Sequence, residues 1–412
     1  MRCQFLLILS IIYFAAEVYT SELIAVVLIF RHGDRTPVDP YPNDPYGNKS
    51  YWPVGFGQLT NKGKEQHFKF GKWLRKRYNN FLPEIYSEED IYVMSTDVDR
   101  TLMSAEANLA GLYPPVGEEI WDKNMKWVPI PIHTRPVQLD PILAAKKPCP
   151  KYDKMYEELY ETDYFKHITH ENHDLYKYLT KNTGYTVSNL QKIQYLYSNL
   201  LIETLYNYTL PSWTSKVFPD KLFALASLGF AVETFTTEMA RLKTGPLFDL
   251  IINYFTNRTN NIDGTPKVLI LSAHDTTIAN VLNSMGVFEY HCPPYTSTIF
   301  FELKRSSTKN TFLNLYYKNS STPRQIKLKD CDVDCNFSDF VEILRPITIS
   351  LNQWEIECKF NLFMWPLSFQ WSIILSCSLI IIILITSAVV AGIRSKKQCT
   401  TNYSQLPNEE YT

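Results

Sequence analysis

Three short apolar runs stand out along the chain, and each leads into a cluster of polar and charged residues. The runs cover residues 22–30, 91–96 and 267–273, and the first reads Glu-Leu-Ile-Ala-Val-Val-Leu-Ile-Phe. Continuous runs rich in β-branched residues are typical of strands that are buried on both faces of a parallel sheet. The pattern therefore predicts three central strands.

Segments with helical character follow these strands, at residues 57–78, 101–112 and 276–285. Strands that alternate with helices build a parallel sheet with helices packed on its faces. We therefore predict an α/β fold with a mostly parallel central sheet flanked by helices.

The stretch from residue 152 to 250 differs, because it is polar and aromatic, has helical periodicity and contains no convincing strand. We interpret it as a smaller α-helical cap domain inserted into the sheet domain. The predicted α/β catalytic domain then consists of residues 21–151 and 251–365.

The N-terminus has the pattern of a targeting segment, with an apolar run over residues 5–16. That run is too short to span a bilayer comfortably, so we expect a cleaved signal peptide at residues 1–20. An uncleaved anchor or a buried helix is the alternative.

A second apolar segment lies near the C-terminus, where residues 371–393 carry no charge. Its length suits a single transmembrane helix, and Arg394, Lys396 and Lys397 follow at once. Positive charge marks the cytoplasmic side. We therefore predict a type I membrane protein with a lumenal or extracellular body and a cytoplasmic tail at 394–412.

Composition narrows the class of protein further. Lysine and arginine number 41 against 42 aspartate and glutamate, so the chain has no general attraction for nucleic acid and we expect no such partner. A hydrophobic share of 45% excludes a disordered chain.

Cysteines and glycosylation sequons agree with a lumenal body. The five cysteines of the body allow at most two disulfides and leave one thiol over. They are Cys149, Cys292, Cys331, Cys335 and Cys358. Asn-x-Ser/Thr sequons predict glycosylation at five sites in the same region. These are Asn48, Asn207, Asn257, Asn319 and Asn336.

The chemistry of the chain is concentrated where the three predicted strands end. Arg-His-Gly-Asp-Arg-Thr-Pro follows the first strand at 31–37, Ser-Thr-Asp-Val-Asp-Arg spans 95–100, and Ala-His-Asp-Thr spans 273–276. Open α/β sheets bind ligands at the carboxyl ends of their strands. Three arginines and two histidines would repel one another there unless an anion is bound, and guanidinium groups match phosphate oxygens.

These residues predict phosphoryl transfer to a histidine. A neutral His32 can attack phosphorus, beside Gly33, which lets the backbone approach a ligand closely. Asp275 would protonate the leaving oxygen and then activate water. The arginines supply the positive charge, so we expect neither a metal nor a cofactor. Alternatively, Asp275 is only a helix N-cap and Arg100 only a surface charge.

The motif Arg31-His32-Gly33-Asp34-Arg35-Thr36-Pro37 resembles the histidine acid phosphatases, branch 2 of the histidine phosphatase superfamily, and in particular the animal lysosomal and prostatic enzymes. Four further segments resemble that family, and together the resemblance covers about residues 21–360. These segments are 58–67, 95–105, 127–134 and 208–213.

The resemblance implies roles for six residues: His32 as the phosphorylated nucleophile, Asp275 as the proton donor, and Arg31, Arg35, Arg100 and His274 as the phosphate-binding groups. It also implies an α/β domain under a helical cap, and a homodimer.

The same resemblance implies two disulfides, Cys149 with Cys358 and Cys331 with Cys335. The family's third pair is missing, since Ile202 occupies one of its positions. Cys292 is then the odd thiol, which we expect to be buried and inert, with pairing between chains as the alternative.

We therefore predict a membrane-anchored acid phosphatase that hydrolyses small-molecule phosphate monoesters or phosphoproteins, with acid pH keeping Asp275 protonated. A phytase-like inositol phosphate phosphatase, a phosphomutase and a non-catalytic receptor on the same fold are the alternatives. Tyr403-Ser404-Gln405-Leu406 resembles a tyrosine sorting signal. The expected location is the lysosomal membrane or the cell surface.

Overall fold

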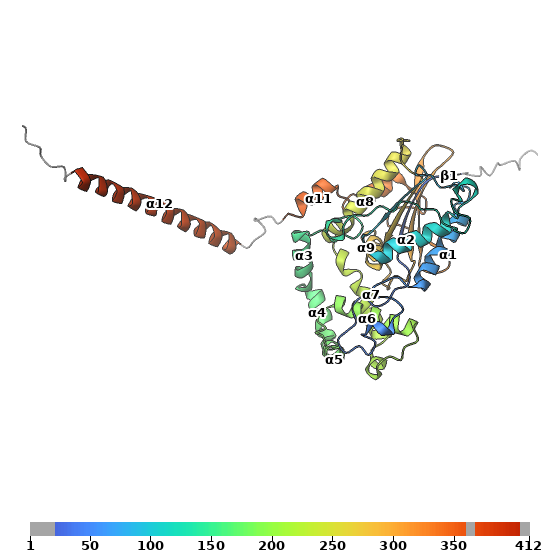
Figure 1. Cartoon of the computed structure of the whole chain (residues 1–412), viewed down its shortest axis with the longest axis horizontal. Helices are drawn as coiled ribbons and strands as arrows, with labels where there is room; N and C mark the ends of the chain where they lie inside the picture. The colour runs from blue at the N-terminus through green and yellow to red at the C-terminus, as the bar shows by residue number, and fades with distance from the viewer. Residues whose placement is uncertain (1–20, 360–366, 404–412) are drawn as a thin grey trace, which may run out of the picture. The chain divides into compact units, whose positions relative to one another are not determined.

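The computed structural model describes residues 21–359 and 367–403 (Figure 1). Described residues up to Cys358 form one compact unit, and the C-terminal helix belongs to a second unit. The expected signal peptide at 1–20 and residues 404–406 of the expected sorting signal lie outside the described residues.

A seven-stranded sheet forms the centre of the first unit, with strand order β2-β3-β1-β4-β5-β6 and β7 beside β5. Its strands are β1 (Glu22–Arg31), β2 (Ile91–Ser95), β3 (Val268–Ala273), β4 (Thr298–Arg305), β5 (Thr311–Lys318), β6 (Arg324–Ile326) and β7 (Cys335–Asn336).

The sheet is mixed, which corrects the expectation of a mostly parallel one. Only β1, β2 and β3 run parallel, and the pairings from β1–β4 onward are antiparallel. The physical reason is the short connection between β4 and β5, residues 306–310, which can close a hairpin but cannot hold the crossover helix that parallel neighbours require. The parallel half carries the predicted strand ends.

Helices cover both faces of the sheet. Helices α1 (Asn61–Arg77) and α2 (Asp99–Leu112) pack on the face that receives Val26, Leu28 and Phe30 of β1. The alternate β1 residues Ala25, Val27 and Ile29 point to the other face. That face is covered by α8 (Thr237–Thr259), α9 (Asp275–Ser284) and α10 (Phe337–Leu344).

Glycines hold α1 and α2 in close contact. A Cβ on Gly71 would lie 1.9 Å from the carbonyl oxygen of Asn108, and one on Gly111 would lie 2.1 Å from that of Phe68. Side chains at these positions would force the helices apart. The close packing fixes the start of α2, where Arg100 lies in the first turn.

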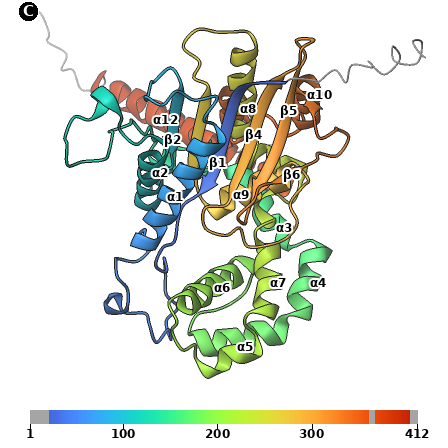
Figure 2. The same cartoon turned by 90° about the vertical axis from the view of Figure 1, so that its right-hand side faces the viewer.

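Five helices of the insertion gather beyond one end of the sheet (Figure 2). They are α3 (Pro150–Tyr160), α4 (Asp163–Glu171), α5 (His173–Thr183), α6 (Leu190–Leu205) and α7 (Asp220–Gly229). Helix α8 begins within the range predicted for the cap, yet it packs Leu247, Phe248 and Ile251 into the core beside the sheet. It therefore belongs to the sheet layers by its packing.

The remaining short helices lie in connections and near the end of the compact unit. They are the 3-10 helices η1 (Lys49–Tyr51), η2 (Gly117–Glu119), η3 (Val137–Leu139), η4 (Ser212–Lys216) and η5 (Val232–Thr234), and the helix α11 (Leu351–Glu357).

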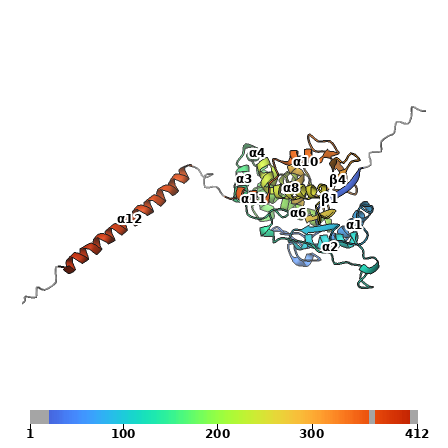
Figure 3. The ribbon, with the colours of Figure 1, turned by 90° about the horizontal axis from the view of Figure 1, so that it is seen from above.

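Helix α12 (Leu367–Tyr403) is continuous and contains the predicted membrane segment (Figure 3). Residues Trp371–Arg394 are long and apolar enough to cross a membrane, by length and composition. The helix continues beyond this segment, so the predicted tail at 394–412 begins in helical conformation.

The two expected disulfides are present. One joins Cys149 to Cys358, which are 209 residues apart in sequence, and the other joins Cys331 to Cys335. Cys292 is a free, half-buried thiol near the hydroxyl of Ser227, and burial raises its pKa to about 11. A thiol with so high a pKa is mostly protonated and unreactive, which agrees with an inert Cys292.

Candidate active site

The carboxyl ends of β1, β3 and β2 lie side by side and bring the predicted polar clusters together. The rings of His32 and His274 are 5.7 Å apart. Arg31 forms an ion pair of 2.8 Å with Asp275, and Arg100 lies 3.4 Å from His274. His32, Asp275 and the predicted cations therefore share one site.

His32 is held as a neutral ring with one free nitrogen. Its Nδ1 lies 2.7 Å from the carbonyl oxygen of Gly33. A carbonyl can only accept a hydrogen bond, so Nδ1 carries the proton and Nε2 keeps its lone pair. Burial, Arg100, Arg31 and Arg35 lower the pKa of His32 well below its usual value. The ring therefore stays unprotonated in acid.

Three arginines around this ring carry more positive charge than the one neighbouring carboxylate balances. Arg31, Arg35 and Arg100 each have a buried Nε without a hydrogen-bond partner. Within the described ranges, Asp275 is the one carboxylate that forms an ion pair with any of them. Burial and the neighbouring Arg35 lower the pKa of Arg100 to about 10. Several buried cations around one carboxylate make a site for an anion.

His274 is oriented by groups on either side of its ring. Arg100 can only donate, so it donates to Nδ1, and Nε2 therefore carries the proton toward the hydroxyl of Thr96, 3.0 Å away. Burial and Arg100 lower the pKa of His274 to about 3. A neutral His274 can contact phosphate only through hydrogen bonds.

Asp275 is the first residue of α9, and His274 is the N-cap, so the reading of Asp275 as a simple N-cap is wrong. Its Oδ1 accepts the amide of Thr276 at 2.9 Å. Burial alone would raise the pKa of Asp275, but Arg31, Arg35 and His274 hold it below its usual value. Acid therefore protonates Asp275 less readily in the free protein than the residue type alone suggests, because Arg31 stabilises the carboxylate.

Gly33 serves a packing purpose that the sequence analysis missed. A Cβ on Gly33 would lie 2.4 Å from the carbonyl oxygen of Gly63 in α1. Its amide donates to the hydroxyl of Ser104 in α2 at 3.1 Å. Close approach to α1 therefore requires glycine at this position.

Tyr295 is a site residue that the strand-end pattern could not find. Its ring centre lies 4.3 Å from the Arg31 guanidinium and 5.9 Å from the His32 ring. Arg31 also donates to the carbonyl oxygen of Pro293. The only signal in the sequence is the segment Pro293-Pro294-Tyr295 itself, which precedes β4.

Helix α6 of the insertion also reaches the site. Arg35 donates to the hydroxyl of Ser198 at 3.4 Å, and Tyr206 donates to Oδ2 of Asp34 at 3.2 Å. Asn199 donates to the carbonyl oxygen of Asp39 at 2.7 Å. The insertion therefore helps to position the loop that follows β1.

A buried acidic cluster lies where α6 meets that loop. Glu203 is fully buried, and neither of its carboxyl oxygens has a hydrogen-bond partner. Asp44 Oδ2 and the Tyr41 hydroxyl are likewise buried without partners. Burial and the nearby Asp44 raise the pKa of Glu203 to about 8, and burial also raises that of Asp44. Glu203 is therefore protonated in acid.

Residues 22–318 match the family described as the histidine phosphatase superfamily (branch 2), and the chain belongs to that family. It is 39% identical over 346 residues to the lysosomal acid phosphatase of Xenopus laevis, covering 82% of this chain and 79% of the relative. It is 37% identical over 350 residues to the prostatic acid phosphatase of Homo sapiens, covering 83% of this chain and 89% of the relative.

Solved structures support the same fold. The Hafnia alvei phytase in complex with myo-inositol hexakis sulphate aligns with a TM-score of 0.62 at 17% identity. The alignment covers 83% of this chain and 99% of the phytase chain. At this identity the likeness bears on the fold alone.

Proposed function

We propose that this protein is an acid phosphatase that hydrolyses phosphate monoesters through a covalent phosphohistidine on His32. The observation that carries the proposal is the group of three arginines, each with a buried and unpartnered Nε, around a neutral imidazole with a free Nε2. The names of the relatives, lysosomal and prostatic acid phosphatase, support the same activity.

In the first step, Nε2 of His32 forms a bond to phosphorus while the bond to the leaving oxygen breaks. Arg31, Arg35 and Arg100 bind the phosphoryl oxygens and stabilise the negative charge that develops on them. The leaving oxygen takes a proton from the carboxyl group of Asp275.

In the second step, water attacks phosphorus and gives its proton to the Asp275 carboxylate, while the bond to His32 breaks and phosphate leaves. Asp275 must enter the cycle protonated, although Arg31 keeps it ionised in the free protein. In acid the ester is a monoanion, because the second pKa of a phosphate group is about 6. Binding this monoanion supplies the proton and draws Arg31 away from the carboxylate.

Acid pH suits both reacting groups. The nucleophile stays neutral because its pKa lies well below the usual value. The substrate brings the proton only while its phosphate is a monoanion. Activity should therefore decline as pH rises above about 6, where the phosphate becomes a dianion.

The alternatives receive less support. A receptor that reuses this fold has no need of a free imidazole nitrogen among buried cations. A phytase-like enzyme would need a broad basic surface for a polyanion, whereas the pocket beside the site also carries carboxylates. A phosphomutase would need access to phosphorylated metabolites of the cytosol, which the expected topology does not give.

The test is hydrolysis of an aryl phosphate by residues 21–358 in the presence of excess chelator, with turnover on a radiolabelled substrate quenched in alkaline detergent. We expect chelator-resistant activity with an acid optimum, and label that is trapped on the protein and lost in acid. His32→Ala should lose both. Label or activity that persists in His32→Ala would overturn the proposal.

Homodimer formation is part of the proposal. Edge strand β2 exposes Tyr92, and the loop that follows α2 exposes Trp121, Met125 and Trp127. Aromatic and methionine side chains are enriched in protein interfaces. Light scattering on purified residues 21–358 should give twice the monomer mass, and a monomeric mass at micromolar concentration would contradict this.

We also propose a type I membrane topology, with α12 as the anchor and delivery to the lysosomal membrane or the cell surface. The lysosomal relatives and the apolar segment Trp371–Arg394 support it. Glycans at Asn48, Asn207 and the three other sequons of the body would prove that it is lumenal. A body that shows no mass change after enzymatic removal of N-glycans would argue against this topology.

A further inference from the structure

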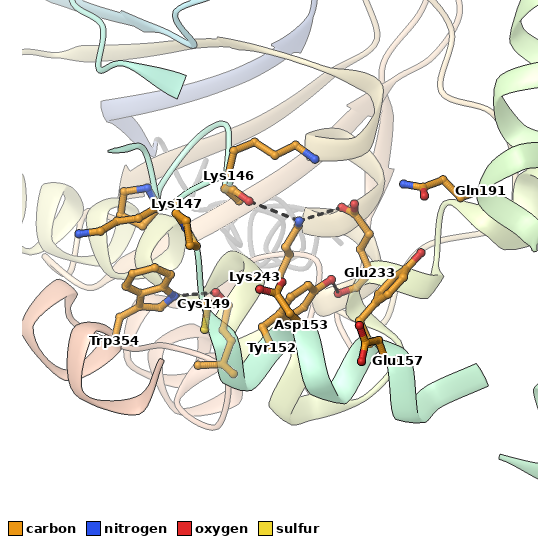
Figure 4. A pocket seen from close by; sticks show the side chains of 15 residues that line it. Lys146, Lys147, Cys149, Tyr152, Asp153, Glu157, Gln191, Glu233, Lys243 and Trp354 are labelled. Atoms are coloured by element: carbon orange, nitrogen blue, oxygen red, sulfur yellow. Dashed lines mark hydrogen bonds and ion pairs between the residues drawn. The ribbon is translucent and has the colours of Figure 1, made fainter. Parts of the chain in front are cut away.

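A pocket of about 490 Å³ lies beside the site, between the helical insertion and the sheet domain (Figure 4). Its walls come from the loop at 141–149, from α3, from the start of α6 and from α8. A second, much smaller cavity of about 20 Å³ shares Lys146, Glu233 and Lys243 with its lining and also touches Thr276, which follows Asp275. The pocket therefore lies on the side of the proton donor.

One face of α6 connects the phosphate site to this pocket. Ser198, Tyr195 and Gln191 lie on this face, because they are separated by three and four residues. Ser198 accepts a hydrogen bond from Arg35, and Gln191 lines the pocket. At 1.5 Å per residue, the path is about 10 Å long.

Tyr195 stands in the middle of this path. Its ring is exposed, and it lies within electrostatic range of both Asp275 and Glu233. Asp275 protonates the leaving oxygen, so the leaving group must begin on this side. A leaving group that extends about 10 Å from the phosphorus along α6 reaches the pocket.

Two lysines on the pocket wall are each balanced by a carboxylate. Lys243 lies 3.3 Å from Glu233, which also accepts a hydrogen bond of 2.7 Å from Asn280. Lys147 pairs with Glu355. These side chains form fixed walls.

The other charges come from facing walls. Lys146 lies on the loop, while Asp153 and Glu157 lie on α3 below it (Figure 4). Lys146 lies within electrostatic range of Glu233 and helps to lower its pKa, so Asp153 and Glu157 add negative charge to the α3 wall of the pocket. The rings of Tyr152, Tyr156 and Trp354 provide apolar surface between them.

We infer that this pocket is a subsite for the residues that flank the phosphorylated side chain of a peptide, with a preference for a basic flanking residue. The inference rests on the proposed phosphatase function and specifies its leaving group. A peptide is long enough to extend from the phosphate site to the pocket, and its apolar and polar groups match the rings and charges of the lining. A basic flanking residue would also bring a cation to Asp153 and Glu157. An inositol polyphosphate would instead bring further negative charge against these carboxylates.

The test compares three phosphotyrosyl peptides whose flanking residues are basic, neutral or acidic, together with an aryl phosphate. The wild-type body should show the highest kcat/KM on the basic peptide. In Asp153→Lys/Glu157→Lys this preference should fall by about tenfold or reverse, since two weak surface ion pairs are replaced by repulsion. The aryl phosphate should be hydrolysed at the wild-type rate, because it does not reach the pocket.

Glu158→Gln is the matched control, since Glu158 lies on α3 outside the pocket and pairs with Lys154. It should leave the peptide preference unchanged. Equal kcat/KM values for the three peptides, or a preference that the double variant retains, would overturn the inference. Loss of aryl phosphate hydrolysis by the wild type would instead overturn the proposed function.

Discussion

Arg31 decides the protonation of Asp275, and this makes the proton donor dependent on the substrate. The two side chains are 2.8 Å apart in the free protein, and the pKa of the carboxyl group is held low. A phosphoryl group that binds Arg31 weakens that ion pair and so favours the protonated acid. In the proposed mechanism, substrate binding therefore favours the form of Asp275 that can act as a general acid.

Asp275→Asn tests this role through the leaving group. With an alkyl phosphate, whose alkoxide leaves poorly, kcat should fall about 10²- to 10⁴-fold, because the leaving oxygen receives no proton. With a nitrophenyl phosphate the loss should be much smaller, since this leaving group departs without protonation. Steady-state kinetics on both substrates measure the difference. An equal loss on both would indicate that Asp275 only holds Arg31 in place.

The residues that sequence could predict are those next to strand ends. His32, Arg100 and Asp275 follow recognisable apolar runs, and the parallel order brings them together. Ser198 and Tyr295 approach from α6 and from the segment before β4, and no local pattern links those segments to the site. Their contacts depend on tertiary packing.

At the scale of elements, the close contact of α1 and α2 depends on the absence of side chains at Gly71 and Gly111. Gly71→Ala places a methyl group 1.9 Å from a backbone oxygen. Overpacking of this kind costs about 1–3 kcal/mol, which corresponds to a fall of roughly 1–4 °C in the unfolding midpoint of a unit of this size. Thermal unfolding followed by circular dichroism measures this change.

Gly55→Ala is the control, because a Cβ there meets only the side chain of Gln58, at 3.6 Å. Its midpoint should stay close to that of the wild type. A Gly71→Ala protein as stable as the control would show that the helices can separate at little cost.

Element boundaries were predicted best where a local signal fixes them. The run at 22–30 is confirmed as β1, which ends one residue later. Helix α1 begins at Asn61 and not at residue 57, because the Thr60 side chain accepts the amide of Gly63 and caps the helix there. The antiparallel strands β4 and β5 were not predicted, because they are joined directly by a hairpin and have no helix between them.

At the scale of the whole molecule, the cluster of Glu203, Asp44 and Tyr41 makes stability depend on pH. The folded-state pKa of Glu203 is about 8, above the usual 4.5. Below about pH 4.5, Glu203 is protonated in both the folded and the unfolded chain, so its burial costs no ionisation free energy. As pH rises toward 8, only the unfolded chain ionises at Glu203, and the free energy of unfolding falls. Ionisation of Glu203 should therefore lower the free energy of unfolding as pH rises through this range.

Glu203→Gln removes this titration while keeping the size of the side chain. The free energy of unfolding of the wild type should fall more steeply with pH than that of the variant, by up to about 1.4 kcal/mol per pH unit between pH 4.5 and 8. Urea unfolding at several pH values measures both slopes. Parallel curves would mean that Glu203 does not titrate in this range.

The Cys149–Cys358 disulfide has a consequence for the integrity of the molecule. It joins the start of α3 to the end of the compact unit, across 209 residues of chain. A protease that cuts an exposed loop anywhere between these cysteines leaves two fragments that remain covalently joined. Such a nicked protein keeps α6, α8 and α9 covalently attached to the C-terminal segment that contains α12. It would separate into pieces only after reduction.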